Sequence, residues 1–165
     1  MKARGYSLVE MMVVIGITSV LLAIGTLQFN TYLKRYRSEA QTRLIHAELL
    51  KTRLNAVYQR RTARLKLYPG RFEVYSSGLD DSAGVAPVRT RTLEFPVTSS
   101  AGGSDGSGYR IDFDAKGLAT KRGSICIQQA DDAVAVDSVV VSASMVRVGK
   151  KDKGDECKSE NITLR

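Results

Sequence analysis

An apolar stretch of 24 residues, Tyr6–Phe29, follows a short basic segment at the start of the chain. Met, Leu, Val and Ile dominate this stretch, and no proline interrupts it. A helix rising about 1.5 Å per residue would be long enough here to cross a hydrocarbon core of about 30 Å. The single charge, Glu10, is costly inside an apolar helix unless it finds a partner. The sequence therefore predicts a membrane helix whose one carboxylate requires an explanation.

Two ordinary kinds of N-terminal segment compete with this interpretation. A secretory signal peptide has a shorter apolar core, of roughly 7–15 residues, and a small-residue cleavage site. Ala23-Ile24-Gly25 resembles such a site loosely. A signal anchor needs no cleavage at all. Neither alternative explains why an acid stands at position 10.

The segment Gly5-Tyr6-Ser7-Leu8-Val9-Glu10 resembles the class III leader of type IV pilins and pseudopilins. The resemblance implies that a prepilin peptidase cuts after Gly5 and that the new amino terminus, at Tyr6, is methylated. Glu10 then matches the acid at the fifth mature position, whereas Tyr6 stands where the family more often has Phe or Met. In this family the peptidase acts on the cytoplasmic side of the inner membrane. The rest of the chain is therefore expected in the periplasm.

Glu10 lies one helical turn beyond Tyr6, on the same face of the expected helix. In an apolar environment an unpaired ammonium or carboxylate is costly, but a matched pair is tolerated. A subunit entering a filament could match its ammonium group to the carboxylate of a neighbour. We therefore expect Glu10 to act in filament assembly by setting the axial register.

A second helix is expected directly after the anchor. Between Asn30 and Tyr68 the chain has ten basic and two acidic residues, so the positive charge of the protein is concentrated there. A capping box of Ser38 with Gln41 would suit its start. Apolar residues recur at three- and four-residue steps and predict a stripe that rests on the following domain: Ala40, Leu44, Ala47, Leu50, Leu54 and Val57.

After Arg61 the pattern changes to short alternating segments. Pro69-Gly70 predicts a hairpin turn, and the Ser- and Gly-rich segment Val97–Gly108 predicts a loop. The expected fold is α+β, a long N-terminal helix packed on an antiparallel sheet domain. Its expected parts are a leader (1–5), a transmembrane helix (6–29), an amphipathic basic stem helix (30–61) and a periplasmic β-rich domain (62–165). Strands are expected at 63–67, 72–75, 89–95, 109–113, 124–128, 134–141 and 144–148.

This second part resembles the GspH/FimT-type minor pseudopilin domain. The resemblance rests on Asn55-Ala56-Val57-Tyr58 at a helix end, on Pro69-Gly70-Arg71-Phe72-Glu73-Val74, and on Ile111–Gly117 as a strand and turn. It implies a structural subunit, with an oxidising periplasm around the domain. An even count of cysteines in that compartment predicts a disulfide between Cys126 and Cys157, although two unpaired buried thiols would fit the count as well.

The sequence contains few residues of the kinds that form catalytic sites. The one histidine, His46, lies in the stem helix, and a helix-surface or packing role is expected for it. Asp112 is expected on the solvated face of a strand, and Asp131-Asp132 in a turn. We expect no enzyme activity, no cofactor and no metal site.

The leading hypothesis is a minor pilin or pseudopilin near the tip of a type IV pilus or a type II secretion pseudopilus, and the sequence does not separate the two. Its expected partners are the prepilin peptidase, the major pilin, other minor pilins and the inner membrane. The alternative hypothesis is DNA binding during natural transformation, as in FimT-like relatives. The basic residues that would carry it are Arg53, Arg60, Arg61, Arg64, Lys150, Lys151 and Lys153.

Overall fold

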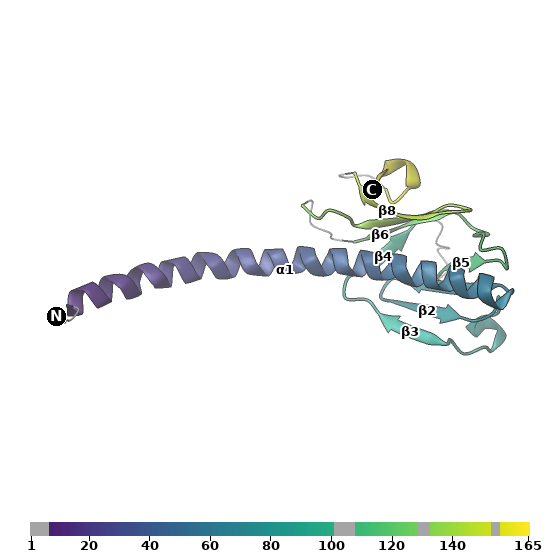
Figure 1. Ribbon diagram of the computed structural model, residues 1–165, viewed down its shortest axis with the longest axis horizontal. Coiled ribbons are helices and arrows are strands. Elements are labelled where there is room, and N and C mark those ends of the chain that lie inside the picture. The colour runs from purple at the N-terminus through teal and green to yellow at the C-terminus, as the bar shows by residue number, and fades with distance from the viewer. Residues whose placement is uncertain (1–6, 101–107, 129–132, 153–155) are drawn as a thin grey trace, which may run out of the picture.

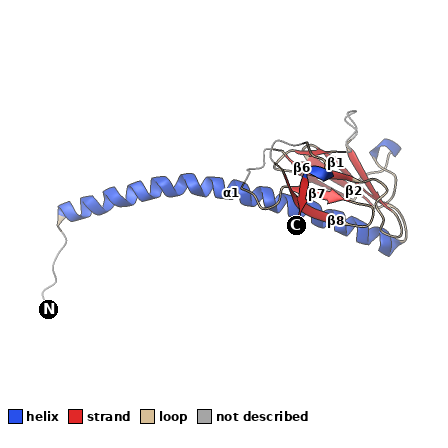
Figure 2. Ribbon diagram, turned by 90° about the horizontal axis from the view of Figure 1, so that it is seen from above, coloured by secondary structure: helices blue, strands red, loops and turns tan. Residues whose placement is uncertain are grey.

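One helix dominates the computed structural model, which describes residues 7–100, 108–128, 133–152 and 156–165. This helix, α1, runs without a break over Leu8–Gln59, so 52 residues extend about 78 Å (Figure 1). Its N-terminal half projects from the β domain, and its C-terminal half lies against that domain (Figures 1 and 2). No structural break separates the expected anchor from the expected stem.

The expected capping box at Ser38 is wrong, because Ser38 lies in the interior of α1 and its carbonyl accepts a hydrogen bond from Thr42 Oγ1. No proline occurs before Pro69, so nothing in the sequence forces a helix boundary there. The helix ends instead at Arg60, which adopts the left-handed conformation (φ 50°). The Arg60 N–H donates back to the carbonyls of Ala56 and Val57, a normal way to satisfy the last turn.

Two antiparallel sheets pack on the C-terminal half of the helix. The first has the strand order β3 (Arg89–Thr92), β2 (Arg71–Tyr75), β1 (Ala63–Tyr68) and β5 (Tyr109–Phe113). The second has the order β4 (Val97–Ser99), β6 (Gly123–Ile127), β7 (Ser138–Val141), β8 (Val146–Lys151) and β9 (Ile162–Leu164). Two short 3-10 turns lie at Asp81–Ala83 and Ser159–Asn161. This arrangement confirms the α+β fold class.

Each of the seven expected strands has a counterpart, with shifted ends, among the nine strands of the described residues. The Pro69-Gly70 turn does join β1 and β2, in a register that puts Leu67 opposite Phe72. The segment expected as a loop from Val97 begins with β4, which pairs with β6. β9, which pairs with β8, was not expected at all. Both unexpected strands have three residues, too few for a sequence pattern to reveal them.

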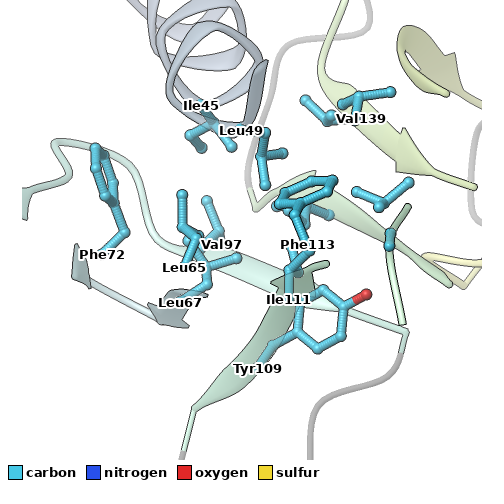
Figure 3. Packing of buried hydrophobic residues seen from close by; sticks show 14 of the residues in the cluster. Ile45, Leu49, Leu65, Leu67, Phe72, Val97, Tyr109, Ile111, Phe113 and Val139 are labelled. Atoms are coloured by element: carbon cyan, nitrogen blue, oxygen red, sulfur yellow. The ribbon is translucent and has the colours of Figure 1, made fainter. Parts of the chain in front are cut away.

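The hydrophobic core lies between α1 and the two sheets. Figure 3 shows Ile45 and Leu49 reaching from the helix toward Phe113 and the neighbouring strand residues. All three of these side chains are almost completely buried. The core therefore holds the C-terminal half of α1 firmly on the domain.

The helix is rotated relative to the orientation that the apolar stripe predicted. The face buried against the domain consists of Ser38, Gln41, Thr42, Ile45, Glu48, Leu49, Thr52 and Ala56. In the predicted stripe, Leu54 is 67% exposed and Val57 44%, while Leu44 and Leu50 are only half-buried. At 100° per residue the two stripes lie on nearly opposite sides of α1. The predicted contact holds only for Leu44 and Leu50, which pack partly buried against the core from the edges of the buried face. It is wrong for the exposed rest of the stripe, Leu54 and Val57 included.

Candidate functional site

The projecting half of α1 is the first functional feature. From Leu8 to Gly25 every residue is exposed, and this segment contributes nothing to the core. Within the described residues, α1 is the one helix long and apolar enough to cross a membrane, with an 18-residue window of mean hydropathy 2.3. Glu10 lies in its first turn and is exposed. Gly5 and Tyr6, the expected cleavage and methylation residues, lie outside the described part of the chain.

The polar and small residues of this segment are compatible with apolar surroundings. Thr18 Oγ1 lies 2.9 Å from the Val14 carbonyl oxygen, and Ser19 Oγ lies 2.8 Å from that of Gly16. Because these hydroxyls donate within their own helix, burying them in lipid or among other helices leaves no donor unsatisfied. A Cβ at Gly16 or Gly25 would meet nothing within 4 Å, so both positions are open to the close approach of a neighbouring helix.

A second exposed surface lies on α1 beyond Gly25, on the side that faces away from the sheets. Its large apolar side chains are strongly exposed: Phe29 60%, Tyr32 65%, Tyr36 63%, Leu54 67% and Tyr58 89%. We call this surface the outer face of α1. Large contiguous apolar surfaces on otherwise folded proteins usually mark interaction sites. The outer face continues the exposed side of the projecting half, with exposed Arg43 and Lys51 between its two groups of apolar side chains.

Hydrogen bonds fix how α1 sits on the domain. The Gln41 side chain donates to the Phe95 carbonyl (2.7 Å) and accepts from the Phe95 N–H (2.9 Å). Arg89 Nη1 donates hydrogen bonds to both carboxylate oxygens of Glu48, at 2.9 and 3.0 Å. On the other sheet, Arg53 Nη1 donates to the Ser144 carbonyl. These side chains are anchored to both sheets, so rotating α1 to bury the outer face instead would break all of them.

The structure confirms the disulfide between Cys126 and Cys157. It joins β6 to the segment before β9 across a sequence separation of 31 residues. A loop of that size is expected to add about 3 kcal/mol to the free energy of unfolding. Ile162 packs beside this disulfide in a small cluster with Val140. The bridge therefore holds β9 and the C-terminus on the second sheet.

The basic residues expected to bind DNA do not form one surface. Arg53, Arg60 and Arg61 lie toward the C-terminal end of α1, far from the projecting half. β8 runs antiparallel to α1, because Ser144 lies beside Arg53 while Val146 lies beside His46. Lys150 and Lys151, at the far end of β8, are therefore displaced toward the opposite end of the domain. Lys153 lies outside the described residues.

Arg64, another of these basic residues, is mostly buried and paired. Its guanidinium binds both carboxylate oxygens of Asp112, at 2.6 and 2.8 Å, and Nη1 lies 2.9 Å from Asp80 Oδ2. The hydrogen bonds that Arg64 donates to the Asp112 carboxylate raise the pKa of Arg64. Asp112 was expected on a solvated face, but it serves as the partner of this arginine. Arg64 has an internal structural role that its position in a basic segment did not reveal.

Asp80 is the buried centre of this ionic cluster, on the face of the first sheet that faces away from α1. In addition to the contact with Arg64, Asp80 Oδ2 forms longer ion pairs with Lys66 Nζ at 3.9 Å and with Arg110 Nη1 at 3.8 Å. Hydrogen bonding from Ser82, together with the Arg64 and Lys66 charges, lowers the pKa of Asp80. The cluster holds the loop after β2 on the sheet. Within the described residues, no group of three or more His, Cys, Asp or Glu side chains could hold a metal ion.

Comparison with known proteins gives three findings. The family model for the prokaryotic N-terminal methylation motif matches residues 1–26, which include Gly5, Tyr6 and Glu10. No curated protein sequence matches the chain. Two crystal structures of the type IV minor pilin FimU of Pseudomonas aeruginosa PAO1 share its fold, each at 16% sequence identity.

The P21 crystal form of FimU aligns with a TM-score of 0.56 over 71% of this chain and 91% of FimU. The P65 form aligns with a TM-score of 0.53 over 67% of this chain and 90% of FimU. At this identity the likeness shows the fold. The methylation motif at residues 1–26 is a separate observation, made on the sequence of the N-terminus rather than on the fold. This protein is thus a pilin-like chain, which joins a prepilin-type methylation motif to the fold of a type IV minor pilin.

Proposed function

We propose that this protein is a minor pilin or pseudopilin, a structural subunit at or near the tip of a type IV pilus or a type II secretion pseudopilus. Before assembly it is held in the inner membrane by α1, with the β domain in the periplasm. Its partners are the prepilin peptidase, the major pilin and other minor pilins. Its role is assembly rather than catalysis.

The observation that carries this proposal is the exposure of α1 together with the placement of its one N-terminal carboxylate. An apolar helix segment that the domain leaves completely uncovered must be covered by lipid or by other helices. Glu10 stands alone among apolar residues, where an unpaired carboxylate is unfavourable. A neighbouring subunit's amino terminus would supply the missing positive charge, and the apolar helix would supply the contact area.

Processing is tested by the intact mass of the protein from membranes, with and without a co-expressed prepilin peptidase. We expect loss of Met1–Gly5 and gain of one methyl group only when the peptidase is present. Replacing Gly5 with Leu should block both changes. An uncleaved chain, or a cut near Gly25, would place the protein among anchored or secreted proteins and contradict the proposal.

Assembly is tested by Glu10→Gln, with Glu160→Gln as the matched control on the exposed surface of the domain. The first variant should be processed normally but reach sheared filaments at least about tenfold less than the wild type, because one buried charge pair is lost. The control should reach filaments at the wild-type level. Equal incorporation of both variants would overturn the assembly role of Glu10.

DNA binding remains a prediction from sequence charge. The residues expected to carry it lie at opposite ends of the domain, and Arg64 is paired internally. We do not favour this function, because no described surface brings the expected residues together. Retention of duplex DNA by the protein at low salt, lost on replacing Arg60 and Arg61 with Gln, would reverse that preference.

A further inference from the structure

A groove of about 720 Å³ lies where α1 leaves the domain, between the helix and the connection from β3 to β4. Its lining includes Leu33, Lys34, Arg37 and Ser38 from the helix, and Phe95 from the connection. The bidentate contact between Gln41 and Phe95 holds the two sides in place. Because its helix residues lie between Asn30 and Ser38, the groove is at the side of the domain next to the projecting half of α1.

The groove lies at the level of lipid headgroups if α1 spans the membrane. The uncharged segment between Glu10 and Lys34 has 23 residues, or about 34 Å of helix, slightly more than a hydrocarbon core of about 30 Å. Lys34 then stands at the edge of the hydrocarbon, and Ser38 about 6 Å further out. The headgroup layer is about 5–8 Å deep on each side, so it coincides with the span from Lys34 to Ser38.

The residues of the groove provide donors for a phosphate group. Lys34 forms no ion pair with any residue in the described part of the chain, while Arg37 uses Nη1 for an exposed pair with Glu94 (3.0 Å) and keeps its other donors. Ser38 is 2% exposed, and its hydroxyl lacks a hydrogen-bond partner among the described residues. A buried hydroxyl without a partner is unfavourable, and a bound acceptor oxygen would satisfy it.

The surroundings suit an interfacial position as well. Tyr32 and Tyr36 are exposed within the same turns of the helix, and tyrosine is enriched at the boundary between hydrocarbon and water. Arg35 adds a further positive charge in this segment. Side chains on a helix tilt toward its N-terminus, which directs the long side chains of Lys34 and Arg37 toward the membrane.

We propose that this groove binds the headgroup phosphate of an anionic phospholipid in the periplasmic leaflet. Lys34 and Arg37 neutralise the phosphate, and the Ser38 hydroxyl donates to one of its oxygens. The bound lipid sets the height and rotation of the domain above the membrane before the subunit joins a filament. This inference rests on the membrane placement in the proposed function, but not on leader cleavage or assembly.

The test is native mass spectrometry of the full-length protein in detergent micelles, titrated with phosphatidylglycerol or with phosphatidylcholine. The wild type should retain one phosphatidylglycerol molecule more tightly than phosphatidylcholine. The double variant Lys34→Gln/Arg37→Gln should weaken that binding at least about tenfold, because charge-assisted contacts are lost. Ser38→Ala, which changes no charge, should weaken it about three- to tenfold.

The matched control is Lys121→Gln/Arg122→Gln, which removes one lysine and one arginine from an exposed loop of the domain. This control should bind phosphatidylglycerol as the wild type does. If it loses as much binding as the groove variant, the attraction is one of overall charge and the proposal is wrong. Unchanged binding by Ser38→Ala and the groove variant would also overturn it.

Two further measurements distinguish a bound lipid from other molecules that could occupy the groove. Inorganic phosphate that displaces the lipid at equal concentration would mean that the groove takes a free anion, and the lipid proposal would fail. A groove variant that keeps the lipid but loses cross-linking to other pilins would mean that the groove takes a neighbour's carboxylate. Because lipid binding is measured on the isolated chain, a failure here leaves the cleavage and assembly tests unaffected, and the reverse also holds.

Discussion

Asp80 shows how one buried residue organises the outer side of the first sheet. Its side chain is 1% exposed and lies among Arg64, Lys66 and Arg110. Replacing it with Asn keeps the size of the side chain but removes the charge that balances these cations. Breaking a buried ion pair from one side costs about 3 kcal/mol or more. We therefore expect Asp80→Asn to lower the free energy of unfolding by about 3 kcal/mol in urea titrations followed by near-ultraviolet circular dichroism.

The same residue predicts how stability responds to acid. Because the pKa of Asp80 is lowered in the folded state, its stabilising contribution is complete above its ordinary pKa of 3.8 and is lost as the pH falls below it. The pKa of Asp81, lowered by the Lys66 ammonium group, acts in the same direction. The wild type should therefore lose stability as the pH falls below about 4, and Asp80→Asn should lose less. Glu156→Gln, in an exposed ion pair with Lys158, is the control and should follow the wild type. Parallel curves for Asp80→Asn and the wild type would contradict this role.

The helix α1 has two stripes with different tasks. The stripe on the domain is small and partly polar, and it is held by core packing and by the contacts of Gln41 and Glu48. The outer face is more apolar and remains uncovered. An apolar pattern on a helix indicates that a partner exists, but it does not say whether that partner lies in the same chain. Here the domain covers one stripe, and we propose that other subunits cover the outer face.

A matched pair of leucines tests this division of the helix. Leu49→Ala should lower the free energy of unfolding by about 2–5 kcal/mol, because it leaves a cavity in the core. Leu54→Ala, on the outer face, should change it by less than about 0.5 kcal/mol but should lower incorporation into filaments. Urea titration and filament shearing measure the two effects. Equal destabilisation by both variants would mean that the outer face is covered within the chain.

The domain and the projecting helix are energetically separate parts of the protein. No residue of the projecting segment Leu8–Gly25 is buried, and the buried face of α1 begins at Ser38. We expect a chain that starts at Asn30 to fold without detergent and to keep the wild-type free energy of unfolding. Size-exclusion chromatography and urea titration check this expectation, with Leu49→Ala in the same truncated chain as a destabilised reference. Aggregation, or a clear loss of stability, would show that the projecting half contributes to the fold.

The parts of the fold that follow from local chemistry could be predicted from the sequence. A long apolar stretch with no proline strongly favours a helix. Pro69-Gly70 between two alternating segments strongly favours a hairpin turn. The two cysteines offered one intramolecular pair, which the disulfide confirms. By contrast, β4 and β9 are three-residue strands that exist because distant strands pair with them, and a local pattern cannot contain that information.

The candidate sites divide in the same way. Glu10 could be singled out from sequence, because a charge in an apolar stretch is conspicuous whatever the fold. Three other features depend on which segments lie side by side: the internal pairing of Arg64, the separation of the basic residues and the groove at Ser38. The charge pattern of the sequence could not predict any of them. The rotation of α1 is the clearest case. Both of its stripes repeat with the helical period, so periodicity fixed the helix, while the hydrogen bonds and core packing of the folded domain selected the face that is buried.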